Sequence, residues 1–103
     1  MKDSEFISGR FLDYEIPKEN RYLKRYFKTD FQLAFLRYYL IFGDYRNFKN
    51  HTGHHCNPRM LLKLRKKFHI LEDEYQNAKG ILTEEAMRTV QLIETGRFVL
   101  TGS

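Results

Sequence analysis

Apolar residues recur at alternating intervals of three and four along the second half of the chain, which is the pattern of an amphipathic helix. Asn57 and Pro58 open this helix with an N-cap residue and the residue best suited to the first helical position. The helix is expected to run to Lys79 and to stop at Gly80, which makes it about 33 Å long. Its predicted apolar stripe consists of Leu61, Leu64, Phe68, Leu71, Tyr75 and Ala78.

Capping residues and glycines mark the ends of four further helices. Pro17 fits the start of the first, and Thr29 with Gln32 has the spacing of a capping box before the second. Asp44 and Thr83 are the predicted N-caps of the other two. A glycine follows each of the last three helices, where the left-handed conformation favours it. The predicted helices span residues 17–28, 31–42, 45–52 and 84–95.

The two ends of the chain show short strand patterns. Residues 11–16 alternate apolar and acidic side chains, and residues 97–101 form a second predicted strand that pairs with the first. The first ten residues show little pattern, and we expect them to fray. A chain of 103 residues is long enough for one hydrophobic core and too short for two. The sequence therefore predicts a single domain, residues 1–103, with a mainly helical fold and two short terminal strands.

The composition is that of a folded, basic protein. Hydrophobic residues make up 42% of the chain and aromatic residues 16%, enough to offset the entropy of ordering it. The net charge is +5 and is unevenly distributed. Residues 1–67 contain 15 basic and 7 acidic residues, whereas residues 68–103 contain 3 and 6. A folded, positive N-terminal part favours a polyanionic partner.

The patterns typical of membrane and secreted proteins are missing from the sequence. No stretch approaches the roughly 20 apolar residues that cross a bilayer, and the first ten residues do not resemble a signal peptide. Cys56 is the only cysteine, so no internal disulfide can form. We therefore expect a cytoplasmic protein that does not associate with membranes.

The order and spacing of the central helices resemble a helix-turn-helix DNA-binding domain. The similarity covers residues 30–70, where the segment YRNFKNHTGHHCNPRMLLKLRKKF contains a helix, a turn with Gly53 and a second helix entered through a cap. The resemblance implies a three-helix core within residues 30–79, flanked by the helix at 83–95, with the helix after Asn57 in the major groove of DNA. The residues expected to hold the helices together are Leu36, Leu40, Phe48, Leu61, Leu64 and Phe68.

Positive charge is concentrated on the outer face of the N-terminal half of the long helix. Arg59, Lys63 and Lys66 lie opposite the apolar stripe, and the acidic residues come only later. Because cations near a helix N-terminus oppose the macrodipole, helix stability alone would favour the reverse order. We therefore predict that this face contacts the phosphates and base edges of DNA. The predicted groove-facing residues are Asn57, Arg59, Lys63 and Lys66, flanked by Lys67, and the predicted backbone contacts are Arg46, Lys49, His54, His55, Lys18 and Arg21. Lys18 and Arg21 belong to a basic stripe on the first predicted helix that also contains Arg25 and Lys28.

A metal centre and an enzyme site are both disfavoured by the sequence. His51, His54, His55 and Cys56 crowd into six residues, whereas zinc sites usually use two separated ligand pairs. Cys56 and the histidine next to it resemble half of a nucleophilic site, but the loop offers no acid to orient the histidine and no oxyanion donor. No glycine-rich phosphate loop or dinucleotide fingerprint is present. The sequence predicts no catalysis, no metal, no cofactor and no small-molecule substrate.

Two alternatives to duplex-DNA binding remain open. The chain could be a helical protein-interaction module whose basic face is incidental, or it could bind RNA, although no stacking platform for single strands is recognisable. The stripe from Leu61 to Ala78 extends beyond what a three-helix core covers. It predicts a homodimer through the stripe and the C-terminal helix, unless the helix at 84–95 covers the stripe within one chain.

Overall fold

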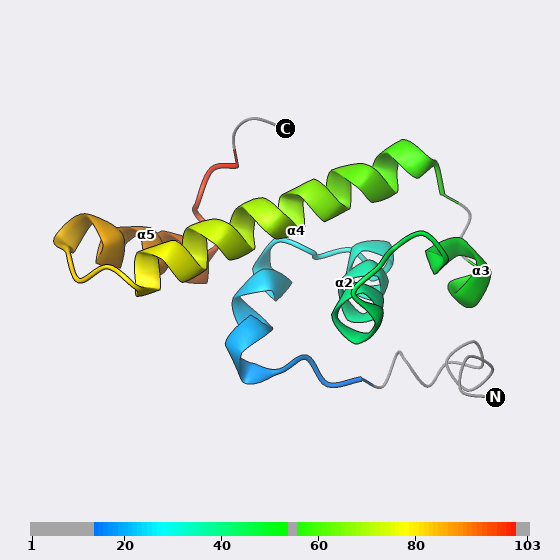
Figure 1. Ribbon diagram of the computed structural model, residues 1–103, viewed down its shortest axis with the longest axis horizontal. Helices are drawn as coiled ribbons and strands as arrows, with labels where there is room; N and C mark the ends of the chain where they lie inside the picture. The colour runs from blue at the N-terminus through cyan, green and yellow to red at the C-terminus, as the bar shows by residue number, and fades with distance from the viewer. Residues whose placement is uncertain (1–13, 54–55, 101–103) are drawn as a thin grey trace.

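A computed structural model of the protein describes residues 14–53 and 56–100 (Figure 1). The long helix α4 runs along most of the molecule. The helices α2 and α3 lie beside its first half, and α5 lies along its second half. Within the described ranges the regular secondary structure is entirely helical. In chain order the elements are the 3₁₀ helix η2 (Lys18–Arg25), α2 (Asp30–Phe42), α3 (Phe48–Thr52), α4 (Pro58–Lys79) and α5 (Glu84–Thr95).

The long helix has the ends and the buried face that the sequence predicts. The Asn57 side-chain oxygen accepts a hydrogen bond from the Arg59 backbone N–H at 2.8 Å, and Pro58 occupies the first turn. The helix ends at Lys79, directly before Gly80. All six residues of the predicted stripe are buried, with exposed fractions of 7% or less. The period of 3.6 residues thus sets the inner face of α4 along its whole length.

An aromatic core joins α2 to the helices on either side of it. Phe48 of α3 is fully buried against α2, with its ring centroid 5.8 Å from that of Phe35 and 5.4 Å from that of Tyr38. Tyr39 of α2 meets Phe68 of α4 edge to face at 4.9 Å. Of the six residues expected to hold the helices together, five are buried, and Leu40 is half-buried. These contacts hold α2, α3 and the first half of α4 together.

The first helix is shorter than predicted and is of the 3₁₀ type. It starts at Lys18, with Pro17 at the N-cap position, and ends at Arg25 rather than at residue 28. The next helix determines this end, because Thr29 is extended and its hydroxyl accepts from the Gln32 N–H at 3.1 Å. The Gln32 side chain in turn accepts from the backbone N–H of residue 28 at 3.1 Å. An α-helix through residue 28 would have competed with this capping arrangement.

The predicted helix at 45–52 begins three residues late, at Phe48. The prediction that Asp44 caps this helix is wrong, because the residue before its first turn is Asn47. Its carboxylate instead accepts from the Arg46 backbone N–H at 3.0 Å and from the Arg46 guanidinium Nη2 at 2.9 Å. The guanidinium and the backbone N–H lower the pKa of Asp44 to about 2. This local turn uses the side chain that would have started the helix, so residues 44–47 stay outside it.

The predicted terminal strands are wrong for the residues that can be checked. Neither 14–16 nor 97–100 forms a strand, while residues 1–13 and 101 lie outside the described part of the chain. The backbone groups find other partners. The Tyr14 carbonyl accepts from Arg37 Nε at 3.3 Å, and the Phe98 N–H donates to the Leu92 carbonyl at 3.1 Å and to the Tyr26 hydroxyl at 3.2 Å. The segment after α5 therefore closes the end of that helix instead of pairing with another strand.

The helix α5 covers the second half of the apolar stripe within one chain. Thr83 caps it, with its hydroxyl accepting from the Ala86 N–H at 3.1 Å, and Ile93 is fully buried. The Tyr75 hydroxyl of α4 donates to Glu94 Oε2 at 2.7 Å. The stripe on which the predicted homodimer depends is therefore buried within one chain. A homodimer stays a prediction, and it would need another surface.

Candidate nucleic-acid interface

Three predicted site residues, Arg59, Lys63 and Lys66, form what we call the α4 basic surface. Their spacing of four and three places them on the face of α4 opposite the buried stripe, and all three are exposed. None of them forms an ion pair with any residue in the described part of the chain. Their positive charge is therefore not neutralised locally and faces solvent.

The other two predicted residues on α4 have structural contacts of their own. The Asn57 side-chain oxygen is engaged as the helix N-cap. Lys67 is half-buried and lies toward η2, with its Nζ 4.9 Å from the centroid of the Phe27 ring. Burial lowers the pKa of Lys67, and the positive charge of Lys28 lowers it further. Lys67 thus lies between the α4 basic surface and Lys28, in the segment that follows η2.

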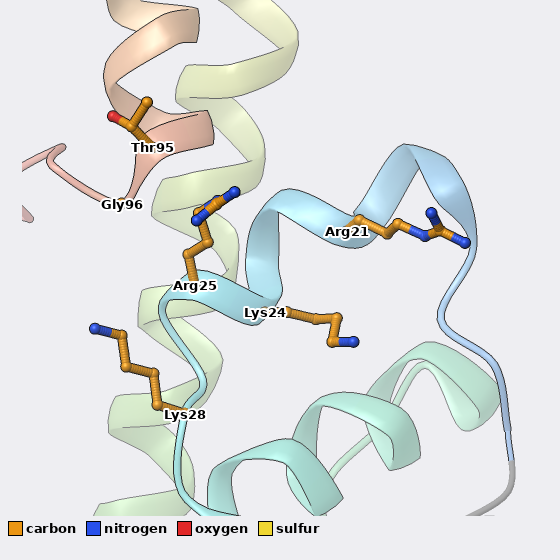
Figure 2. A pocket seen from close by; sticks show the side chains of 6 residues that line it. All are labelled: Arg21, Lys24, Arg25, Lys28, Thr95 and Gly96. Atoms are coloured by element: carbon orange, nitrogen blue, oxygen red, sulfur yellow. The ribbon is translucent and has the colours of Figure 1, made fainter.

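A second group of cations lines a pocket between η2 and the end of α5, which we call the basic pocket (Figure 2). Its volume is about 450 Å³. Arg21, a predicted backbone contact, lines it, whereas Lys18 is exposed at the start of η2 and does not. The complete lining is Arg21, Lys24, Arg25, Lys28, Thr95 and Gly96.

Sequence reasoning missed Lys24 because it assumed an α-helix. At 3.6 residues per turn, Lys24 falls off the basic stripe that contains Arg21 and Arg25. The observed η2 is a 3₁₀ helix, in which side chains three apart are aligned, so Lys24 lies on the same side as Arg21. Thr95 and Gly96 could not have been found from spacing at all, since they reach the pocket only through the docking of α5.

The residues of segment 44–56 that are predicted to contact the DNA backbone differ in their exposure and in their partners. Arg46 is exposed, but its guanidinium is paired with Asp44 at 2.9 Å, so its charge is already partly neutralised. Lys49 is exposed on α3. Burial raises the pKa of the Cys56 thiol, and the charge of Lys49 lowers it in part. The predicted residues His54 and His55 lie outside the described part of the chain.

His51 of the cluster considered for metal binding and His69 of α4 both contact tyrosines of α2. The Tyr38 hydroxyl is 2.6 Å from His51 Nδ1, and the Tyr39 hydroxyl is 2.8 Å from His69 Nε2. These hydrogen bonds link α2 to α3 and to α4. Among the residues that the structure describes, no three His, Cys, Asp or Glu side chains are grouped so that they could hold a metal ion.

An apolar hollow of about 400 Å³ borders the α4 basic surface. The sequence did not predict it, because its walls come from α2, α4 and the segment after α5. Lys63 and Lys67 are its charged members. The complete lining is Phe31, Gln32, Met60, Lys63, Leu64, Lys67, Ile70 and Leu100.

Comparisons with protein-family models, with curated proteins and with solved structures find no match to this chain. In the described residues, no helix combines the length and the apolar character required to traverse a bilayer. Any function must therefore be argued from the surfaces themselves.

Proposed function

We propose that the protein binds duplex DNA and that the α4 basic surface is the part that faces it. The observation behind this proposal is the exposed row of Arg59, Lys63 and Lys66, which has no ion-pair partner among the described residues. Arg59, in the first turn of α4, lies where the macrodipole disfavours positive charge, and Lys63 and Lys66 continue the row over the next two turns. A solvated surface needs no such polarity, whereas a polyanion lying against the first half of α4 gives it a purpose.

The dimensions of α4 suit a groove of B-DNA. The half of the helix that presents the basic surface is about 16 Å long, and an α-helix fits a major groove about 12 Å wide. Each Lys or Arg that contacts a phosphate releases condensed counterions, which lowers affinity as salt rises by a slope of about 0.9 per phosphate. Three contacts from α4 predict a clearly salt-dependent affinity.

In this proposal α4 is the recognition helix of a helix-turn-helix unit, and α2 and α3 support it. The helix α3 has five residues, and five more separate Thr52 from Pro58. A typical turn of this motif has about three or four residues. The proposal therefore depends on the charge distribution more than on the motif. The protein would act as a regulator or as the DNA-recognition part of a larger assembly.

Charge reversal on α4 tests the proposal. The variant Lys63→Glu, Lys66→Glu should lose DNA binding while staying folded, because exposed substitutions usually change stability by only about 0.5 kcal/mol. A matched control, Lys79→Glu, Arg88→Glu, makes the same change in net charge at exposed positions away from this surface. Fluorescence anisotropy with random duplex DNA at two salt concentrations gives the affinities, and circular dichroism reports the fold.

The results of this experiment distinguish DNA binding by α4 from its alternatives. A folded Lys63→Glu, Lys66→Glu variant that binds DNA as well as the parent protein would overturn the proposal. Equal losses in the control would show a general charge effect. Tighter binding of an RNA duplex than of a DNA duplex would favour the RNA alternative. Loss of Arg59 should relax preference at one or two base pairs, at a cost of about 1–3 kcal/mol.

A protein-interaction module is the second candidate, favoured by the apolar hollow beside α4. The Leu61–Ala78 stripe cannot dock a partner, because it is buried, but the hollow has an apolar wall that includes the half-exposed Met60. If a second copy of the chain docks here, Met60→Gln should shift a dimer toward monomer in sedimentation velocity. A parent protein that is monomeric at tens of micromolar would contradict self-association.

A further inference from the structure

The basic pocket is a concentration of positive charge distinct from the α4 basic surface. None of its four cations forms an ion pair within the described ranges of the chain. Figure 2 shows Arg25 extending toward Thr95 at the end of α5, while Arg21 and Lys24 extend the other way along η2. The cations are therefore spread along the pocket, which favours an elongated anion over a compact one.

The wall of the pocket is held by packing contacts. Gly96 ends α5 with φ +80°, and a Cβ built on it would lie 3.4 Å from the Arg25 Cβ. The Tyr26 hydroxyl donates to the Leu92 carbonyl at 3.3 Å and accepts from the Phe98 N–H at 3.2 Å. These contacts hold the end of α5 against η2, so the pocket is present before any ligand binds.

The end of α5 does not account for four cations. A helix C-terminus has the equivalent of about half a negative charge, which offsets less than one of them. The C-terminus of α5 therefore accounts for Arg25, which lies beside Gly96, but not for the other three cations of the pocket. A single phosphate monoester has a charge of roughly −1.5 to −2 at pH 7, which would neutralise about half of the group. Two or more phosphates match the charge of the pocket.

We propose that the basic pocket binds a chain of two or more linked phosphates. Arg25 and Lys28 would hold the end beside α5, and Arg21 with Lys24 the other end. Arginine supplies a planar pair of donors for phosphate oxygens, and lysine supplies a mobile point charge. The same chemistry is offered by a free polyphosphate and by consecutive phosphates of a nucleic-acid strand. The site is independent of the proposed DNA binding by α4, since no residue of the α4 basic surface lines the pocket.

Titration calorimetry with inorganic tripolyphosphate tests the site. The parent protein should bind it with one-to-one stoichiometry and more tightly than orthophosphate. Arg25→Gln, Lys28→Gln should weaken binding by about tenfold or more, equivalent to about 1.4 kcal/mol. The matched control Lys79→Gln, Arg88→Gln removes the same charge elsewhere and should bind like the parent. No saturable binding, or an equal loss in the control, would overturn the proposal.

Further variants keep the test decisive. If the first double variant fails to fold, Arg21→Gln, Lys24→Gln removes two cations away from the packed end of α5, and the same weakening is expected. Lys63→Glu, Lys66→Glu should retain tripolyphosphate binding even where DNA binding is lost. Displacement of tripolyphosphate by duplex DNA from the parent protein identifies a nucleic-acid strand as the occupant. If duplex DNA does not displace tripolyphosphate, the occupant of the pocket is a free polyphosphate. Loss of tripolyphosphate binding in the Lys63→Glu, Lys66→Glu variant would overturn the proposal that the pocket is independent of the α4 basic surface.

Discussion

In the first half of α4, residues 58–68 include five cations and no carboxylate, whereas residues 69–79 include three carboxylates and one cation. Both halves bury the same apolar stripe. In the second half, two of the four charged side chains contact an aromatic ring or an imidazole. Lys79 Nζ lies 5.1 Å from the centroid of the Tyr75 ring, and His69 Nδ1 lies 3.9 Å from Glu72 Oε1. The inner face of one helix thus serves the fold throughout, whereas its outer face changes from positive in the first half to negative in the second.

The largest effect should come from the stripe that the two halves share. Leu64→Ala and Leu71→Ala should each lower the free energy of unfolding by about 2–5 kcal/mol, because both leave cavities in a packed core. Leu62→Ala, at a position 37% exposed, is the control and should change it by less than about 0.5 kcal/mol. Urea denaturation measures all three. A Leu71→Ala variant as stable as the control would mean that α5 does not cover this half.

The next effect concerns the glycine that lets α5 close over the second half. Gly96→Ala places a Cβ in left-handed backbone and against Arg25, so it should cost about 1–2 kcal/mol. Gly80→Ala is the matched control, because Gly80 has φ −83° and its added Cβ would meet only ordinary contacts at 3.6 Å. It should be neutral or stabilise by about 0.4–1 kcal/mol. Thermal unfolding distinguishes the pair, and equal melting temperatures would contradict the close approach of α5.

Tyr75 in the second half of α4 and Tyr22 of η2, which stack on each other, should respond oppositely to loss of the hydroxyl. Tyr22 and Tyr75 stack with ring centroids 3.8 Å apart. Tyr75→Phe loses the hydrogen bond to Glu94 and should cost about 1 kcal/mol at pH 7. The buried Tyr22 hydroxyl has no hydrogen-bond partner among the described residues, so Tyr22→Phe should be neutral or stabilising. Destabilisation by both would show that Tyr22 does have a partner.

The raised pKa of Tyr75 predicts that the free energy of unfolding depends on pH. Burial raises the pKa of Tyr75 to about 12, with Glu94 adding to the shift. Because the pKa is higher in the folded state, the stabilisation is complete below about pH 10, the value in the unfolded chain, and is lost as pH rises toward 12. The stability difference between the parent and Tyr75→Phe should therefore shrink between pH 10 and 12. A constant difference would contradict the raised pKa.

The smallest effect should come from the carboxylates on the outer face of the second half. Asp73→Asn, Glu74→Gln removes two exposed negative charges on the helix that we propose binds DNA. It should strengthen DNA binding by about two- to threefold at low salt and lose this effect at high salt, where exposed charges are screened. Anisotropy titrations measure it. No change at low salt would mean that the two outer faces act independently.

Local patterns predicted most of the helices and part of the candidate site. The stripe, the Asn57 and Thr83 caps and the Arg59, Lys63 and Lys66 row follow from interactions between residues at most four positions apart, which a sequence displays directly. Local competition produced the errors at the end of η2 and at the start of α3. The side chain of Asp44 was taken as a cap although it forms a turn with its own neighbour.

The sequence by itself determined where α4 and α5 begin and end, which face of α4 is buried and which half of the chain is positive, because periodicity, capping and charge are local properties. The tertiary structure alone decided that α5 covers the stripe, that residues 97–100 close a helix end and that four cations meet Gly96 in one pocket. The deciding hydrogen bonds of Tyr26 join residues 66 and 72 positions apart. Such pairs have no spacing rule, since they form only when packing brings distant surfaces together.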